Sequence, residues 1–306
     1  SGSFKSGYKY VLDFDGANTA DQDPGQGAEA KVNADFTGDF WKVSLTGDAV
    51  EYGKDKLDAT AAIYLDKALA EQGMDMGDIA LTLHIGDGVD GDLPTVLADK
   101  AEFRKDAQMA LATTGKNFGI TLGYADLFTV YATVDPTLAA LPMAAGVTLD
   151  PVEGITAAVG FTNDYAGNNG LTVSAKADVA KLAGLDFALA ATGEMMLDID
   201  ASTTVITADV ATTIEGIGLW AAYQKTAADV NKMAVKASYS TKVNEVTVGA
   251  GVKFAVTDLS DLANKYEVTV DGSASYAMGG VTYALAADYK VKAQALTIKP
   301  TVAISF

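Results

Sequence analysis

The chain ends in a segment where apolar and polar residues alternate strictly. One parity holds Leu296, Ile298, Pro300, Val302, Ile304 and Phe306, and the other holds Thr297, Lys299, Thr301, Ala303 and Ser305. Successive side chains of a β-strand point to opposite faces, so this pattern predicts a strand with one apolar face and one polar face.

The same alternation recurs along nearly the whole chain, between short segments rich in Gly, Asp, Asn and Pro. It predicts about eighteen strands, with about sixteen as the alternative count, because boundaries read from one sequence are good to a few residues. The predicted strands cover residues 8–14, 28–36, 41–45, 57–65, 79–85, 103–111, 118–134, 143–149, 155–161, 171–179, 185–199, 206–214, 217–223, 233–239, 246–254, 266–276, 281–289 and 296–306. We expect strand 57–65 to continue through Lys67 and Leu69, and 118–134 to be one long strand.

The polar parity carries charged residues at mid-strand and is otherwise dominated by Gly, Ala, Ser and Thr. The charged positions include Lys31, Lys42, Lys176, Asp209, Lys236, Lys253, Asp271 and Lys299. Charges are costly in a packed core but are tolerated in a water-filled lumen. The fold class predicted is therefore all-β, a transmembrane up-and-down antiparallel β-barrel wide enough for a channel. A β-sandwich of this length would need two domains, and no linker separates two halves.

Aromatic residues recur where the predicted strands end, for example Phe14, Phe161, Tyr223 and Phe254. Most lie on the apolar parity. In lipid-facing barrels such residues form girdles at the two membrane interfaces.

Composition narrows the functional classes. The net charge is −18 and Arg104 is the only arginine, so a basic face for nucleic acid is excluded. Cysteine is absent, which excludes disulfides and thiolate metal sites. No uninterrupted apolar run is long enough for a transmembrane helix. We expect residues 1–306 to form a single barrel domain, with residues 1–3 left over from cloning and any targeting segment removed before them.

Over nearly its whole length the chain resembles bacterial outer-membrane porins in pattern. Its last strand resembles their C-terminal assembly signal, carried by Val302, Ile304 and Phe306. The alanine-rich, acidic composition is similar to porins of non-proteobacterial double-membraned bacteria, some of which carry an N-terminal cell-wall-binding domain. The resemblance implies an outer-membrane location with both termini in the periplasm, contact with lipid and the barrel assembly machinery, and a homotrimer.

Candidate catalytic and metal-binding residues are few. His84 is the only histidine, it lies on the polar parity, and no Gly-x-Ser-x-Gly motif accompanies it, so we expect no enzyme. Asp87, Asp90 and Asp92, interspersed with glycines, resemble a loose calcium loop. They lack the distal bidentate glutamate, and ordinary acidic turns are the simpler interpretation. No other cofactor is expected.

The segment 86–102 is the third external loop in the predicted barrel. In many porins this loop folds inward and narrows the pore. Folded inward, it would bring Asp87, Asp90, Asp92 and Asp99 near Arg104, Lys31, Lys42 and other lumen lysines such as Lys299. Opposed charges across a constriction set ion preference. The alternative is an ordinary outward-facing surface loop.

The function predicted is a porin that allows passive diffusion of small hydrophilic solutes and ions, with a modest cation preference. The first alternative is a structural or adhesive envelope barrel without a significant open pore. The second is a soluble acidic surface-layer or adhesin protein built as a β-sandwich.

Overall fold

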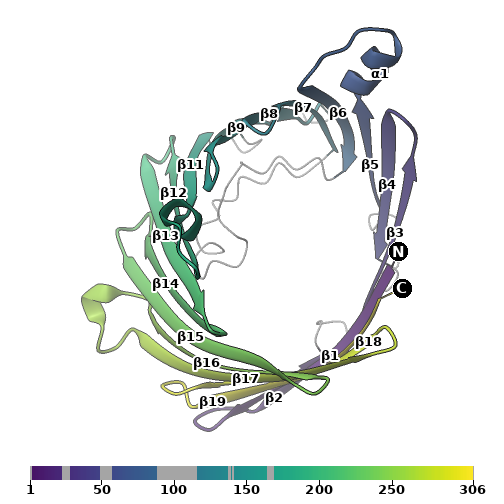
Figure 1. Cartoon of the computed structure of the whole chain (residues 1–306). Helices are drawn as coiled ribbons and strands as arrows, with labels where there is room; N and C mark the ends of the chain where they lie inside the picture. Colours follow the sequence, from purple (N-terminus) through teal and green to yellow (C-terminus); the bar gives the residue numbers. More distant parts are fainter. Residues whose placement is uncertain are drawn as a thin grey trace.

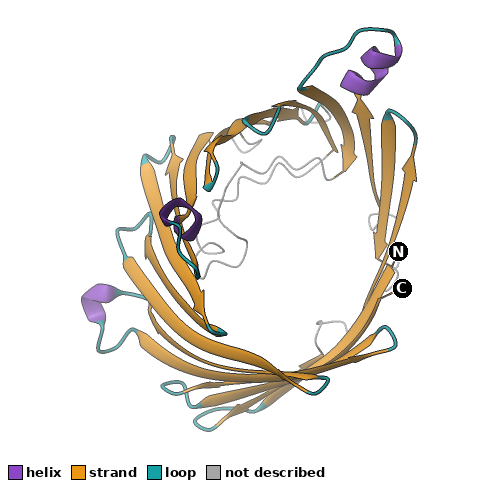
Figure 2. Ribbon diagram, in the orientation of Figure 1, coloured by secondary structure: helices purple, strands orange, loops and turns teal. Residues whose placement is uncertain are grey.

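A single antiparallel sheet closes on itself into a barrel in the computed structural model (Figure 1). The structure describes residues 2–22, 28–48, 57–87, 116–136, 139, 141–163 and 169–305. Strands dominate (Figure 2). No helix among the described residues is long and apolar enough to cross a membrane.

The first half of the barrel contains ten strands and one helix. These are β1 (Gly2–Asp13), β2 (Thr19–Gln22), β3 (Ala28–Thr37), β4 (Trp41–Asp48), β5 (Leu57–Tyr64), α1 (Leu65–Glu71), β6 (Ile79–Asp87), β7 (Lys116–Tyr124), β8 (Phe128–Val134), β9 (Met143–Val152) and β10 (Ile155–Asn163).

The second half adds nine strands and two short helical turns. These are β11 (Asn169–Asp178), α3 (Val179–Ala183), β12 (Ala188–Asp198), β13 (Thr203–Ile214), β14 (Ile217–Lys225), β15 (Asn231–Val243), β16 (Val246–Val256), the 3₁₀ turn η2 (Leu259–Asp261), β17 (Tyr266–Met278), β18 (Val281–Lys290) and β19 (Ala295–Ser305).

The barrel wall has eighteen strand positions, because β2 and β3 both pair with β1 and together fill one position. Every other strand pairs with its neighbours in sequence. The register Ser3↔Ser305 joins β1 to β19 and closes the wall. We call the end where the two termini meet the terminus end, and the opposite end the far end. The predicted fold class and strand count are confirmed, and the β-sandwich alternative is wrong.

The apolar parity faces outward, as the alternation predicts. Val210, Val235 and Leu285 lie at mid-strand and remain 41%, 39% and 49% exposed, which is unusual for large aliphatic side chains in water. Aromatic rings pair near strand ends, with 5.7 Å between the Tyr124 and Phe128 centroids. The outer face is therefore an apolar band with aromatic ends.

Residues 118–134 form two strands, not one. The turn Ala125–Leu127 separates β7 from β8, with Ala125 at φ 46°. Tyr124 and Phe128 are cross-strand partners, and partners point to the same face. A three-residue loop therefore preserves parity across the turn, which is why the alternation resembled one strand.

Two further boundaries differ from the prediction. Lys67 and Leu69 belong to α1 and do not extend β5, because the segment Leu65–Glu71 is rich in strong helix formers. The predicted strand 103–111 lies outside the described residues. β6 pairs directly with β7, so the described sheet has no strand between these two. The structure has two strands, β7 and β8, where the sequence predicted one over 118–134. The number of strand positions therefore remains eighteen.

Candidate functional site: the inner wall of the barrel

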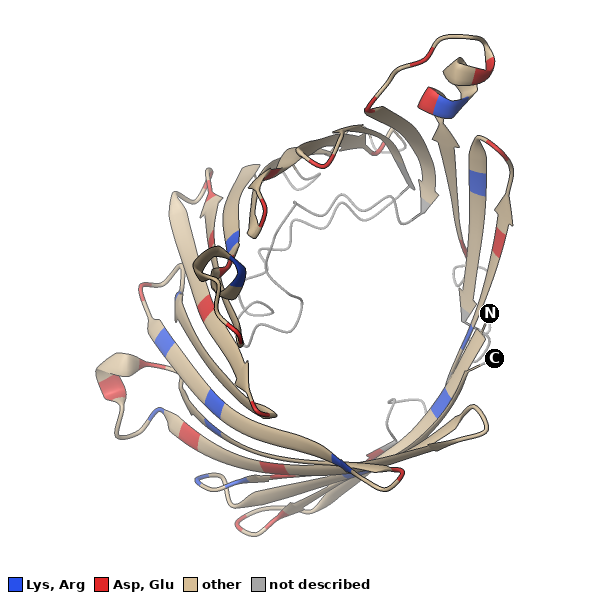
Figure 3. Ribbon diagram, in the orientation of Figure 1, with Lys and Arg blue, Asp and Glu red and all other residues tan. Residues whose placement is uncertain are grey.

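Because the apolar parity of the closed sheet faces outward, the polar parity faces the inside of the barrel. Figure 3 shows that charged residues of both signs are distributed around the strands and turns. Two ion pairs stabilise the charges that the sequence places there. Lys42 Nζ lies 3.1 Å from Asp35 Oδ2, and Lys236 Nζ lies 2.9 Å from Asp271 Oδ1. Each pair remains partly exposed, so solvent screening keeps its contribution to stability small. Its main effect is to fix where donors and acceptors stand in the lumen.

Small residues let the longer side chains lie along the wall. A Cβ added at Gly251 would meet Asp271 Oδ2 at 2.8 Å and Lys236 Cε at 3.0 Å, so the ion pair lies across this glycine. Trp220 packs in the same way against the buried alanines Ala222 and Ala234. The abundance of glycine and alanine on the polar parity therefore provides room for a few larger side chains.

One arc of the wall, on β11 to β14, is a buried polar row. The registers Ser174↔Glu194, Glu194↔Thr207 and Thr207↔Gln224 make these four residues consecutive cross-strand neighbours. Their exposed fractions are 2%, 6%, 2% and 0%. This arc is therefore not open to solvent, although its side chains lie on the polar parity.

The predicted constriction residues are only partly within the described structure. Lys31 lies on β3, Lys42 on β4 and Lys299 on β19, all on the polar parity. Asp90, Asp92, Asp99 and Arg104 lie outside the described residues, as does the side chain of Asp87.

Lys31 and Lys42 are not brought together, although β3 and β4 are neighbours. Lys31 pairs with Asp48, whereas Lys42 pairs with Thr37. The two lysines are thus about 20 Å apart along the strands at about 3.3 Å per residue. Of the C-terminal signal, Val302 and Ile304 face outward at 36% exposure each, and Phe306 lies outside the described residues.

His84 is a wall residue on β6. Its Nε2 lies 3.0 Å from Oγ1 of Thr121, a diagonal neighbour on the adjacent strand β7. No carboxylate hydrogen bond to this histidine is found in the part of the chain that the structure describes. Nor do the described residues include a group of three or more side chains suited to a metal ion.

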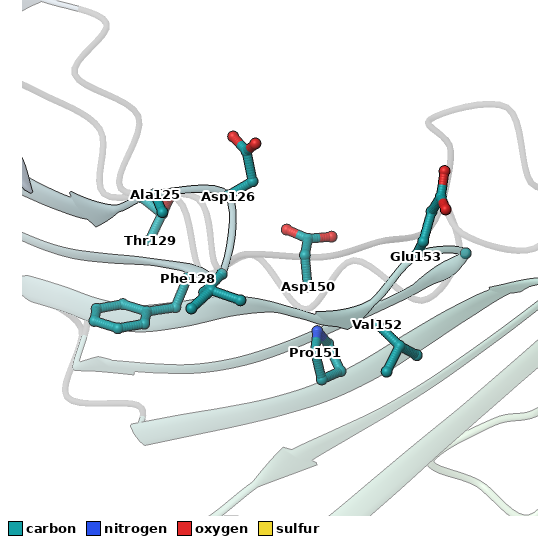
Figure 4. Close-up of a pocket in the computed structure, with 10 residues that line it drawn as sticks. Ala125, Asp126, Phe128, Thr129, Asp150, Pro151, Val152 and Glu153 are labelled. Carbon is teal, nitrogen blue, oxygen red and sulfur yellow. The ribbon is translucent and has the colours of Figure 1, made fainter. Parts of the chain in front are cut away.

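A cavity of about 640 Å³ lies at the terminus end, between the turns β7–β8 and β9–β10. Asp126, Asp150 and Glu153 point to the same side of this rim (Figure 4). Lys181 of α3 lies 2.6 Å from Glu153, and this hydrogen bond raises the pKa of the lysine. Thr156 donates a 2.6 Å hydrogen bond to Asp150. Two of the three carboxylates therefore already have partners within the chain.

Sequence reasoning overlooked Trp220. It was detectable, because it is a bulky aromatic residue on the polar parity of 217–223, flanked by the apolar-parity residues Leu219 and Ala221.

Comparison with known proteins identifies a fold but no sequence relative. No protein-family model and no curated protein matches the chain. Among solved structures, OpdN of Pseudomonas aeruginosa matches with TM-score 0.58 and 11% identity over 100% of this chain and 98% of its own. A mutant porin of Rh. blastica matches with TM-score 0.50 and 11% identity over 100% and 98%.

A third match has a different described role. Wzi of Escherichia coli, an outer-membrane protein involved in group 1 capsule assembly and described as a carbohydrate-binding β-barrel, matches with TM-score 0.55 and 9% identity. The alignment covers 99% of this chain and 84% of Wzi. At these identities the likeness concerns the fold alone. The chain therefore has a closed eighteen-stranded barrel fold that is similar to the folds of these bacterial porins.

Proposed function

We propose that the protein is an outer-membrane porin through which small hydrophilic solutes and ions diffuse passively. The observation that carries this proposal is the closed wall with large apolar side chains outside and ion pairs such as Lys236–Asp271 inside. A wall of this kind satisfies its backbone internally and separates lipid from water. Eighteen-stranded barrels are wide enough to hold an aqueous channel.

The mechanism involves no chemical step, and we propose no enzymatic activity and no cofactor. The polar wall supplies hydroxyl, ammonium and carboxylate groups that replace part of a solute's hydration. The net charge of −18 supports a modest cation preference. Outer-membrane lipid, the barrel assembly machinery and two further copies of this chain are the partners we propose, with both termini on the periplasmic side.

Reconstitution into planar bilayers tests the pore. We expect stepwise single-channel currents and, in a salt gradient, a reversal potential displaced toward that of the cation. Clear anion preference would reject the cation proposal. A purified chain that needs no detergent, and that migrates identically on gels before and after heating, would argue against a membrane barrel altogether.

The constriction stays a proposal that the same bilayers can test. We propose that the segment between β6 and β7 narrows the pore, so deletion of residues 88–98 should raise the conductance. An unchanged conductance would reject this role. Calcium binding by Asp87, Asp90 and Asp92 is a weaker proposal, and calcium titration of the intact barrel against the deletion variant would test it.

The buried polar row on β11 to β14 supports one alternative. If Glu194 and Gln224 are buried because the lumen is filled, the barrel is a structural or adhesive envelope protein without a significant pore. A correctly folded, detergent-dependent protein that carries no current would favour this second function.

A further inference from the structure

Trp220 is a large aromatic side chain on the inside of a wall built mainly from small residues. Its neighbours on β14, Leu219 and Ala221, belong to the outward parity, and Leu219 is 44% exposed on that face. Trp220 therefore points inward, where it is half-buried. A packed core explains most buried tryptophans, but the residues around Trp220 on the inward parity are mainly small or charged.

The indole of Trp220 packs against a cluster of alanines in the wall. Ala222 and Ala234 are 4% and 0% exposed and form one apolar cluster, against which Trp220 and Ala255 pack. The three alanines come from β14, β15 and β16, and the registers Ala222↔Ala234 and Ala234↔Ala255 place them side by side. One side of the indole thus packs on alanines, while the ring as a whole stays only half-buried.

Polar groups lie on both sides of Trp220 and its alanine cluster. Lys236 is the direct cross-strand partner of Trp220, and its ammonium is held 2.9 Å from Asp271 across Gly251. On the other side, Asp209 is the partner of Ala222 and accepts a hydrogen bond from Thr192. The site therefore combines an aromatic surface with fixed donors and acceptors at its edges.

We propose that Trp220 and its polar neighbours form a binding site for a cyclic polyol, a pyranose sugar, on the inner wall. The C–H face of a pyranose ring is apolar and stacks on an aromatic ring, while its hydroxyls form hydrogen bonds to charged groups. Lys253 on β16 is the cross-strand partner of Lys236. The two lysines balance Asp209 and Asp271, so the charged groups around Trp220 sum to no net charge, which suits a neutral sugar better than an organic cation. The inference rests on the proposed function, because the sugar must enter the lumen.

Fluorescence tests binding without requiring conduction. The chain has two tryptophans, so Trp41→Phe leaves Trp220 as the only one, and Trp220→Phe leaves only Trp41 as the matched control. We expect maltose to shift the emission of the Trp41→Phe protein in detergent, and to leave the Trp220→Phe protein unchanged. The open-chain polyol sorbitol should have no effect on either. No maltose response, or an equal response to sorbitol, would overturn the site, and a response to tetramethylammonium but not maltose would overturn the sugar assignment.

Bilayer currents separate this inference from the pore itself. We expect maltose to reduce the ion current of the natural protein. Trp220→Ala should lose most of that block, whereas Trp220→Tyr, which keeps an aromatic face, should retain it. Channels that conduct but show no maltose block overturn the sugar site and leave the pore intact. A fluorescence response from a barrel that never conducts supports the site and overturns the pore.

Discussion

The tightest turns at the terminus end place single non-glycine residues in the left-handed backbone conformation. Glu215 and Gly216 join β13 to β14 with φ of 49° and 82°, and Asn244 begins the equivalent turn between β15 and β16 at φ 56°. Two-residue turns of this kind match the twist of their strands but require left-handed backbone. Asparagine and glycine adopt that conformation with the least strain, so glutamate is the poorer choice at position 215.

At the residue scale we predict that Glu215→Asn stabilises the barrel. The gain should be about 0.5–1 kcal/mol, a fraction of the roughly 1–2 kcal/mol that left-handed backbone costs an L residue. Urea unfolding in lipid vesicles measures it. Asn244→Ala makes the reverse change and should destabilise by a similar amount. Equal free energies of unfolding for all three proteins would show that backbone strain at these turns does not affect stability.

Element by element, a strand's two faces meet different surroundings. On β15, Val235 is 39% exposed on the outward parity, while Ser238 lies on the polar parity. Outward charges near the middle of a membrane barrel are strongly unfavourable, whereas lumen charges are not.

We therefore predict opposite results for one substitution at two positions of β15. Val235→Lys should lower the free energy of unfolding in lipid by about 2–4 kcal/mol. Ser238→Lys should change it by less than about 0.5 kcal/mol, as surface substitutions usually do. Similar losses at both positions would contradict the assignment of the two faces.

The η2 turn at the far end depends on a titratable cap. Asp258 accepts hydrogen bonds from the Ser260 hydroxyl at 2.6 Å and the Ser260 backbone N–H at 2.9 Å. These bonds lower the pKa of Asp258. A depressed carboxyl pKa stabilises the turn above the unfolded pKa, and this contribution is lost as the pH falls through the folded value.

We accordingly predict that acidification loosens residues 257–265 before it affects the wall. The protection factors of these amides, which correct the exchange rate for its intrinsic pH dependence, should fall as the pH drops below the ordinary aspartate range, and strand amides should stay protected. Asp258→Asn keeps an acceptor but cannot titrate, so its exchange should lack this pH dependence. A loss of protection in the variant equal to that in the natural protein would rule out the Asp258 cap as the cause.

For the whole molecule, closure between β1 and β19 decides whether the sheet has edges. The pairs extend from Ser3↔Ser305 to Asp13↔Ala295, with a gap at Tyr8 and Lys9. Without β19, both β1 and β18 would expose unpaired backbone, which is prohibitive in lipid and prone to aggregation in water.

We predict that a chain ending at Lys290 cannot form a barrel. In refolding into detergent it should lose the heat-modifiable migration expected of the full chain, and it should aggregate. The full-length variant Lys299→Ala changes β19 without removing it and should refold normally. Heat-modifiable, monomeric behaviour of the truncated chain would show that closure by β19 is dispensable.

The sequence by itself determined the faces of the strands, because side-chain direction alternates locally and needs no partner. It therefore assigned Val210 and Val235 to the outward parity, where both are exposed, and Lys42, Lys236 and Lys299 to the opposite parity. Only the tertiary structure decided the pairings, because hydrogen bonding across a turn is not a local property. A parity-preserving loop hid the turn at Ala125–Leu127, and α1 replaced the extension of β5.

The inner-wall site shows the same division. Parity alone places Trp220, Lys236 and Asp271 inside. Their convergence depends on the registers of β14 to β17 and on Gly251, which leaves room for an ion pair between residues on non-adjacent strands. Alternation fixes which way a side chain points, and register decides which other side chains it meets.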